Sequence, residues 1–462
     1  MQDPAANSLT DVVAAHVVAT SFDDLPPEAI RAARRALLDA LGVMLAATGL
    51  AEHAVPYRES AIRYGSGACR VLGTEQRTGP IEAASANGAL AHALDFGDCF
   101  DPGPAHPHAA LVPALMAIAD IRPSCDLGQF LAAVAVGGDL ACRLSIAPAQ
   151  PYETGGWYPP PLVNLVSSAA VSAKLLGLGL TGVVQAIGLS LLSGAFPAAL
   201  KHDSGSPLRG VREAFAARGA VEAALLAEAG AAGFSDPLGG SGGFFDVYGS
   251  GCRSDVLLDR LGQHFLGTEV SFKPWPACRG THAFIEAALE LRKLADPADI
   301  DAMTAGIGPI QEMLVQRLPP WPQPISPTQA KFSIPYAVAV AFAEGKVGLD
   351  SFDPAHLGDE RIRCFAAKLE AIQVPGWGRE HAASGRLAIS LTDGTQHELE
   401  VIEALGSPNR SLSDQALVQK FTECALRAAH PLSPTISATV AEIILSGYPA
   451  LPIASLLDHL SG

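Results

Sequence analysis

The chain has 462 residues, of which 49% are hydrophobic and only 17% are charged, with 45 glycines and 35 prolines. Charged residues make up about a quarter of a typical soluble domain, so this chain is depleted in charge, and its many apolar residues argue against disorder. The formal net charge of −16 argues against sequence-independent nucleic-acid binding and against docking on anionic lipid, because both need a dense basic face. The length predicts roughly two to three domains with a large core.

The eight cysteines are widely spaced and form no C-x-x-C pair, which excludes a zinc or iron–sulfur framework. A chain of this length does not need a disulfide scaffold. Residues 1–10 hold no basic cluster before an apolar core, so no signal peptide is expected. We therefore expect scattered thiols in a reducing cytoplasm.

One uncharged stretch, residues 175–200, is long enough to span a bilayer. It contains the run Gly-Leu-Gly-Leu-Thr-Gly over 177–182, which predicts a break between two short buried helices. We expect no membrane partner.

Helical patterns dominate the first part of the chain. Residues 7–50 predict two helices, the second beginning with Pro26-Pro27-Glu28. Further helices are predicted over 83–94, 109–119, 129–147, 162–176, 183–195 and 211–230. They are apolar nearly all round, which is typical of helices buried in a large bundle. No strand-like alternation precedes residue 265.

The pattern changes after Phe265. Short strands are predicted over 270–272, 302–310, 370–374, 387–391 and 398–402, helices over 282–294 and 334–343, and a Pro-rich loop over 318–327. Asp393-Gly394 is a hairpin turn signal. Helices return over 414–429 and 435–446. We predict a mainly α protein: a large all-helical domain built from both chain ends (1–266 and 405–462) and a smaller inserted α+β lid domain (267–404).

The first polar cluster lies where a helix runs into a loop with three acids. Asp95, Asp98 and Asp101 are followed by the turn His106-Pro107-His108. Carboxylates and imidazoles together supply a general base and a proton donor. They are also metal-ligand types, and the simplest alternative is a solvated loop whose acids cap the next helix.

The second cluster runs from Lys273 to His282 and places Arg279 beside a glycine at a helix N-terminus. Free N–H groups and the helix dipole add to the side-chain charge there, which predicts an anion site. The alternative is that Arg279 pairs with a surface acid. In a third cluster Ser333 resembles an N-cap, so Tyr336 would lie in the first turn of a helix; a lone tyrosine there more often serves packing.

These clusters occur in an order that resembles the MmgE/PrpD family. The motifs that carry the resemblance cover nearly the whole chain: Leu38-Asp39-Ala40-Leu41-Gly42, Asn87-Gly88-Ala89, Leu94-Asp95-Phe96-Gly97-Asp98, His106-Pro107, Cys278-Arg279-Gly280-Thr281-His282, Ala330-Lys331-Phe332-Ser333-Ile334-Pro335-Tyr336, Gly345-Lys346-Val347 and Lys420-Phe421. The resemblance implies a helical domain closed by both chain ends, a lid, and a homodimer with the site between the two domains. It also implies active-site roles for Asp95 and His106, for Lys273 and for Tyr336.

Three positions depart from the family pattern. Cys99 stands where the family usually has Thr or Ser, and Tyr158 stands where an active-site His is expected. The family's lysine ahead of an Ala-rich helix is not clearly present, and the cations that could replace it are Lys201, Arg209 and Arg212.

The family is known for 2-methylcitrate dehydratase, cis-aconitate decarboxylase and iminodisuccinate epimerase. We therefore expect a cytoplasmic, cofactor-independent lyase that needs no metal and dehydrates a 2-methylcitrate-like di- or tricarboxylate. Asp95, His106 and Tyr336 would handle protons. The substrate-binding set would be Lys273, Arg279, His282, Arg212, Tyr158 and Cys99. The alternatives are a decarboxylase, an epimerase or isomerase (favoured by the loss of the His at Tyr158), and a non-catalytic paralogue that binds carboxylates.

Overall fold

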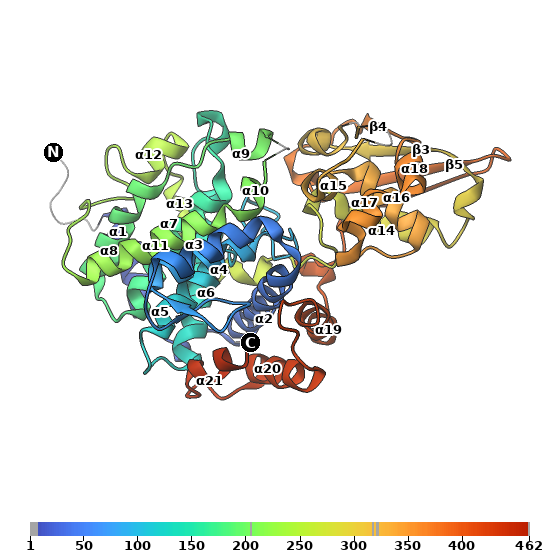
Figure 1. Ribbon diagram of the computed structural model, residues 1–462. Helices are drawn as coiled ribbons and strands as arrows, with labels where there is room; N and C mark the ends of the chain where they lie inside the picture. The colour runs from blue at the N-terminus through green and yellow to red at the C-terminus, as the bar shows by residue number, and fades with distance from the viewer. Residues whose placement is uncertain (1–7, 204–205, 317, 320–322, 461–462) are drawn as a thin grey trace. The chain divides into compact units, whose positions relative to one another are not determined.

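The computed structural model describes residues 8–203, 206–316, 318–319 and 323–460. The chain divides into two compact units (Figure 1). Unit 1 comprises Met1–Val270 and Ser413–Gly462, and unit 2 comprises Ser271–Leu412. The second unit is thus inserted between two segments of the first.

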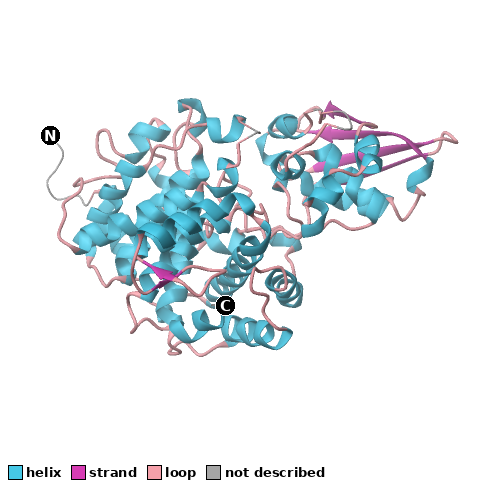
Figure 2. Ribbon diagram, viewed as in Figure 1, coloured by secondary structure: helices cyan, strands magenta, loops and turns pink. Residues whose placement is uncertain are grey.

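Unit 1 is a bundle of helices, as Figure 2 shows in cyan. Its longer helices are α1 (Leu9–Ala19), α2 (Pro27–Leu50), α3 (Val55–Tyr64), α4 (Pro80–Ala91), α5 (Leu111–Asp120), α6 (Leu127–Ile146), α7 (Pro159–Leu175), α8 (Leu180–Ser190), α11 (Glu213–Glu228), α19 (Asp414–Ala425) and α20 (Pro434–Ser446). Shorter helices are α9 (Ala199–His202), α10 (Leu208–Val211), α12 (Phe244–Gly249), α13 (Ser254–Leu257) and α21 (Ile453–Leu457).

Local sequence explains where several of these helices begin. Asp126 accepts a hydrogen bond from the backbone N–H of Gln129 and caps α6, and Ser413 and Ser433 cap α19 and α20 in the same way. Helix α7 starts with prolines, whose missing N–H costs nothing in a first turn. These signals confirm the sequence-based helix starts to within a few residues.

Helix α7 lies at the centre of unit 1 and packs against α6, α8 and α11. All of its residues from Pro159 to Ala173 are buried. Helix α4 meets α11 at Gly88, where a Cβ atom would lie 2.8 Å from the carbonyl oxygen of Glu213. Glycine therefore permits a close approach of two helices that both carry candidate site residues.

Helix α6 is long and apolar enough to cross a membrane, and 89% of its most apolar window is buried inside the protein. Helices α2 and α3 pass the same test only as a pair bent by 93°. Core helices of soluble proteins meet these criteria too. The uncharged stretch of residues 175–200 is broken after α7, and α8 is only 11 residues long, as the glycine run predicts.

Unit 2 is built on a four-stranded sheet in the order β4-β3-β5-β6, drawn in magenta in Figure 2. Strand β3 (Ile300–Ile307) pairs parallel to β4 (Leu369–Gln373) and antiparallel to β5 (Gly385–Leu391), which pairs antiparallel to β6 (Gln396–Val401). The predicted turn joins β5 to β6, and Gly394 takes a φ of 88° there. Helices α14 (His282–Leu291), α15 (Pro327–Lys331), α16 (Ile334–Glu344), α17 (Pro354–Leu357) and α18 (Glu360–Ala366) complete the unit.

The structure confirms a mainly α chain and corrects several elements. No strand forms over 270–272, where the N–H of Phe272 donates to the carbonyl of Gly406 from a loop. A two-stranded ladder, β1 (Cys69–Arg70) with β2 (Arg77–Thr78), precedes residue 265, and its strands are too short to show alternation. The predicted helix over 83–94 ends at Ala91, so the first acids of the polar cluster lie in a turn. Residues 320–322 of the predicted Pro-rich loop lie outside the described residues.

Candidate active site

The polar cluster of unit 1 begins where α4 ends. His92 is the C-terminal cap of α4, and the N–H of Asp95 donates to the carbonyl oxygen of His92 at 3.0 Å, which closes a tight turn. Asp95 takes a φ of 50°, in the left-handed region. That conformation costs an L-residue other than glycine about 1–2 kcal/mol. The surrounding contacts must therefore hold Asp95 in place.

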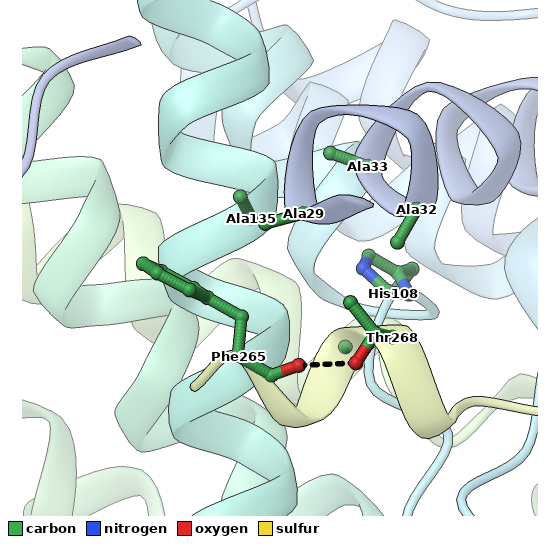
Figure 3. A pocket seen from close by; sticks show the side chains of 8 residues that line it. Ala29, Ala32, Ala33, His108, Ala135, Phe265 and Thr268 are labelled. Atoms are coloured by element: carbon green, nitrogen blue, oxygen red, sulfur yellow. Dashed lines mark hydrogen bonds between the residues drawn. The ribbon is translucent and has the colours of Figure 1, made fainter. Parts of the chain in front are cut away.

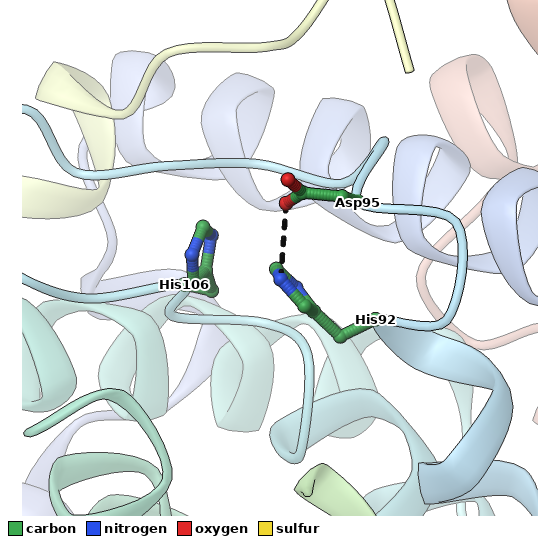
Figure 4. A group of neighbouring side chains, drawn as sticks. All are labelled: His92, Asp95 and His106. Atoms are coloured by element: carbon green, nitrogen blue, oxygen red, sulfur yellow. Dashed lines mark ion pairs between the residues drawn. The ribbon is translucent and has the colours of Figure 1, made fainter. Parts of the chain in front are cut away.

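Two imidazoles lie beside the Asp95 carboxylate (Figure 4). His92 Nε2 lies 3.0 Å from Asp95 Oδ1, and the rings of His92 and His106 are 4.3 Å apart between centroids. His92 and Asp95 are buried, with 3% and 4% of their surfaces exposed. The interaction between these two groups is therefore weakly screened by water.

Asp98 contacts two histidines, His106 of this cluster and the neighbouring His108. Its carbonyl oxygen lies 2.7 Å from His106 Nδ1, and its carboxylate contacts His108 Nδ1. A carbonyl oxygen only accepts, so His106 Nδ1 carries the proton, and in the neutral ring Nε2 is then the basic nitrogen. The arrangement thus sets the tautomer of His106 as a proton acceptor at Nε2.

A second layer connects His106 to α7 and α11. The side-chain amide of Asn164 donates to the carbonyl oxygen of His106 at 2.9 Å and to Glu213 Oε2 at 3.0 Å. Glu213 is fully buried, and burial raises the pKa of its carboxyl, although Arg212 and the Asn164 bond oppose the shift. Arg212 Nε lies 3.1 Å from Glu213 Oε1, and the guanidinium lies over the ring of Tyr158 at 5.2 Å. Tyr158 and Arg212, both predicted from departures from the family pattern, are therefore in contact.

The cation that would replace the family lysine has three candidates in unit 1. Arg212 is buried and its Nη1 donates to the carbonyl of Arg209. Arg212 Nη2 is buried without a hydrogen-bond partner among the described residues. Arg209 Nη1 donates to the carbonyl of Lys201 at 3.4 Å. Among the contacts described, Arg212 joins the network around His106 through Glu213 and Asn164.

Of the remaining predicted residues, Cys99 lies half-buried in unit 1, in the loop that follows Asp98, and the others belong to unit 2. Lys273 is fully buried. Arg279 lies in the turn before α14, where its Nη1 donates to the carbonyl of Leu405 at 2.9 Å. His282 begins α14 and its Nε2 lies 3.1 Å from the carbonyl of Ala277. The predicted helix start is therefore present, and Arg279 also bonds the backbone of its own unit.

Tyr336 lies in the first turn of α16, capped by Ser333 as predicted. It is fully buried, and its hydroxyl donates to the carbonyl of Ser351 at 2.8 Å. Burial raises the pKa of this phenol. A proton-transfer role for Tyr336 would require the hydroxyl to leave that bond.

Sequence reasoning did not assign roles to His92, Asn164 and Glu213. His92 precedes Asp95 by one helical turn, and that spacing is the signal that would have paired them. Asn164 is an amide in a helix that is buried from Pro159 to Ala173, and a buried polar group needs a partner. No local signal points to Glu213, because its partner lies on another helix.

His92, Asp95 and His106 are also a possible metal-ligand set, since their ligand atoms all lie within 4.8 Å of one another. A separate cavity borders His108 and is lined by alanines of α2 and by Phe265 and Thr268 (Figure 3). Its volume is about 10 Å³, which suits one water molecule. That cavity is too small for a polycarboxylate.

The fold is that of a mainly helical protein, and its polar cluster brings together carboxylate and imidazole groups, the types that transfer protons in enzymes. The model of the MmgE/PrpD N-terminal domain matches residues 11–256, and that of the MmgE/PrpD C-terminal domain matches residues 275–432. The chain therefore belongs to the MmgE/PrpD family, which confirms the resemblance found in its motifs.

Named relatives are enzymes. The chain is 27% identical over 431 residues to the cis-aconitate decarboxylase of Mus musculus, and this alignment covers 90% of this chain and 86% of the relative. It is 26% identical over 429 residues to the cis-aconitate decarboxylase-like protein oryM of Aspergillus oryzae, covering 87% of each. It is 26% identical over 360 residues to the 2-methylcitrate dehydratase of Escherichia coli, covering 72% of each. The relatives thus include both a decarboxylase and a dehydratase.

Proposed function

We propose that this chain is a lyase of di- or tricarboxylates that works by acid–base proton transfer and needs no cofactor. The observation that carries the proposal is the group formed by the buried Asp95 and His92 with the half-buried His106. A C–H bond beside a carboxyl group becomes removable when nearby cations neutralise the developing charge. A positioned carboxylate or imidazole then takes the proton, and a second group protonates the leaving hydroxyl.

In this proposal His106 Nε2 or Asp95 accepts the proton, and Arg212, Lys273 and Arg279 bind substrate carboxylates. Tyr158, Cys99 and His282 complete the binding set. The simplest reaction is dehydration of a 2-methylcitrate-like substrate. We further propose a cytoplasmic homodimer, which light scattering of the purified protein would test.

Decarboxylation is the second candidate. The alignment with the mouse cis-aconitate decarboxylase covers 90% of this chain, against 72% for the Escherichia coli dehydratase. In a decarboxylation the carbon–carbon bond to one carboxyl group breaks, carbon dioxide leaves, and the acid–base group returns a proton to carbon. The same cluster would serve both reactions.

A panel of citrate, 2-methylcitrate, cis-aconitate and related polycarboxylates, analysed by NMR, tests the proposal. We expect water loss or carbon dioxide release from at least one member, and its abolition by Asp95→Asn and by His106→Gln. Asp101→Asn, in the same loop, is the matched control and should retain turnover.

Several results would change the assignment. Deuterium exchange into a substrate without net product would indicate epimerisation, which the change to Tyr158 favours. Thermal stabilisation by a carboxylate with no turnover would indicate a binding protein. Loss of activity on chelation, restored by a divalent metal, would assign His92, Asp95 and His106 to a metal ion instead. Tyr336→Phe with unchanged kcat would remove Tyr336 from the mechanism.

A further inference from the structure

A buried lysine from the C-terminal segment reaches the loop that carries Asp95. Lys420 lies on α19 and is 7% exposed. Its Nζ donates to Asp39 Oδ1 on α2 at 2.6 Å and to the carbonyl oxygen of Phe96 at 2.7 Å. The ammonium also lies 3.9 Å from the centroid of the Phe96 ring. Phe96 directly follows Asp95.

The packing of α2 and α19 explains how Lys420 gets this close. Gly42 faces α19, and a Cβ atom there would lie 3.1 Å from a ring carbon of Phe421 and 3.3 Å from its Cα. The glycine lies one helical turn after Asp39 on α2, so the two helices approach closely beside the ion pair. Burial raises the pKa of the Asp39 carboxyl, and the Lys420 ammonium opposes that shift.

The contact between Lys420 and Phe96 matters because of the backbone conformation of the preceding residue, Asp95. Asp95 has a φ of 50°, which the chain does not prefer. A charge-assisted hydrogen bond to the next carbonyl opposes relaxation of that turn, and such bonds are roughly twice as strong as neutral ones. The cation–π contact restrains the ring of the same residue. Two contacts from the Lys420 side chain, which is itself anchored by Asp39, thus hold the segment that orients the Asp95 carboxylate toward His92.

We propose that Lys420 is a positioning residue for Asp95, so that the segment after unit 2 organises the candidate active site of unit 1. In this scheme Lys420 acts through the backbone and ring of Phe96. The consequence for catalysis rests on the proposed function, whereas the consequence for the loop does not.

The test compares Lys420→Met with a matched control on the same two helices. Asp414 on α19 forms an ion pair with Arg31 of α2 at 3.0 Å and contacts Arg35, so Asp414→Asn also breaks charge pairs between α2 and α19. Among the contacts described, none joins Asp414 to residues 92–100. Hydrogen exchange followed by mass spectrometry should show faster exchange across residues 92–100 in Lys420→Met and no such change in Asp414→Asn.

The kinetic measurement uses the polycarboxylate on which the wild-type enzyme is active. We expect Lys420→Met to lower kcat by about 10- to 100-fold, the scale of small misplacements of a reacting group, with KM little changed. Lys420→Arg keeps the charge and the donors, so it should recover part of both the exchange protection and kcat. If Lys420→Met does not accumulate as folded protein, Lys420→Gln, whose short amide cannot reach both acceptors, takes its place with the same expectation.

Unchanged exchange over 92–100 in the Lys420 variant would overturn the proposal. The proposal would also be overturned if Asp414→Asn, at the same thermal stability as Lys420→Met, showed the same faster exchange over residues 92–100. General loosening of α19 would then explain the effect. A loop change in Lys420→Met with no turnover by the wild-type enzyme on any polycarboxylate would sink the proposed function and leave the positioning of Asp95 supported.

Discussion

Asn164 offers a direct measure of the network behind His106. The side chain is fully buried and donates two hydrogen bonds, to the carbonyl of His106 at 2.9 Å and to Glu213 Oε2 at 3.0 Å. Asn164→Leu keeps a similar volume and removes one hydrogen bond from each acceptor, while the His106 carbonyl still accepts from the N–H of Ala109 at 3.1 Å and Glu213 keeps its ion pair with Arg212. A lost hydrogen bond costs about 0.5–1.5 kcal/mol at a neutral acceptor and about 1.5–3 kcal/mol at a charged one, and the leucine recovers part of that by apolar burial. We expect the free energy of unfolding to fall by about 2–4 kcal/mol.

The assay is urea unfolding followed by circular dichroism, together with kcat on the identified substrate. Loss of the Asn164 bond to the His106 carbonyl should let the imidazole shift, so kcat should fall by about tenfold or more. Ser168→Ala is the matched control, because Ser168 lies one turn further along α7, is fully buried, and its Oγ has no hydrogen-bond partner among the described residues. That variant should stay within about 0.5 kcal/mol of wild type. Equal stability losses in both variants would refute the argument.

Three further predictions concern stability and thiol chemistry. Burial lowers the pKa of His16 to about 4. Between pH 6.5 and pH 4 the unfolded chain therefore binds a proton that the folded chain does not, and the free energy of unfolding falls as the pH falls. In urea titrations at a series of pH values, His16→Gln should remove about 2–3 kcal/mol of that decline. Alkylation at pH 8, mapped by mass spectrometry, should modify the exposed Cys364 first and spare Cys424, because burial raises the pKa of the latter to about 12. Gly88→Ala should push α4 from the backbone of α11 and lower unfolding free energy by about 1–3 kcal/mol, whereas Gly267→Ala, with nothing within 4 Å of the added Cβ, should change little.

Periodic apolar patterns predicted the helices well because a helix buried in a bundle needs apolar residues at every turn. Helix α7 is apolar on nearly all faces and is buried on nearly all faces. The hairpin between β5 and β6 was predictable because Asp393-Gly394 is a local signal. The segment over 270–272 has the composition of a strand, but its backbone bonds to the distant Gly406 and never enters the sheet. Composition alone does not record which partner a backbone finds.

The candidate site divides in the same way. Asp95 and His106 were predicted because they lie in one short stretch with a dense concentration of polar residues. Asn164 and Lys420 reach that stretch from 58 and 324 residues away in sequence. Each lies within a helix, and nothing nearby in the chain marks its partner. Local sequence therefore predicts which groups could do chemistry, while the residues that hold them in place emerge only from the fold.

The insertion of unit 2 has a consequence in time. Lys420, the partner of Asp39, follows it by 381 residues in the chain. At synthesis rates of about 5–20 residues per second, the ribosome needs roughly 20–80 seconds to deliver it. During that interval the residues of unit 2 are already available to form its core, whereas α19 is not yet present to pack against α2. A nascent chain therefore passes through an interval in which the carboxylate of Asp39 lacks its ammonium partner and α2 lacks the helix that packs against it.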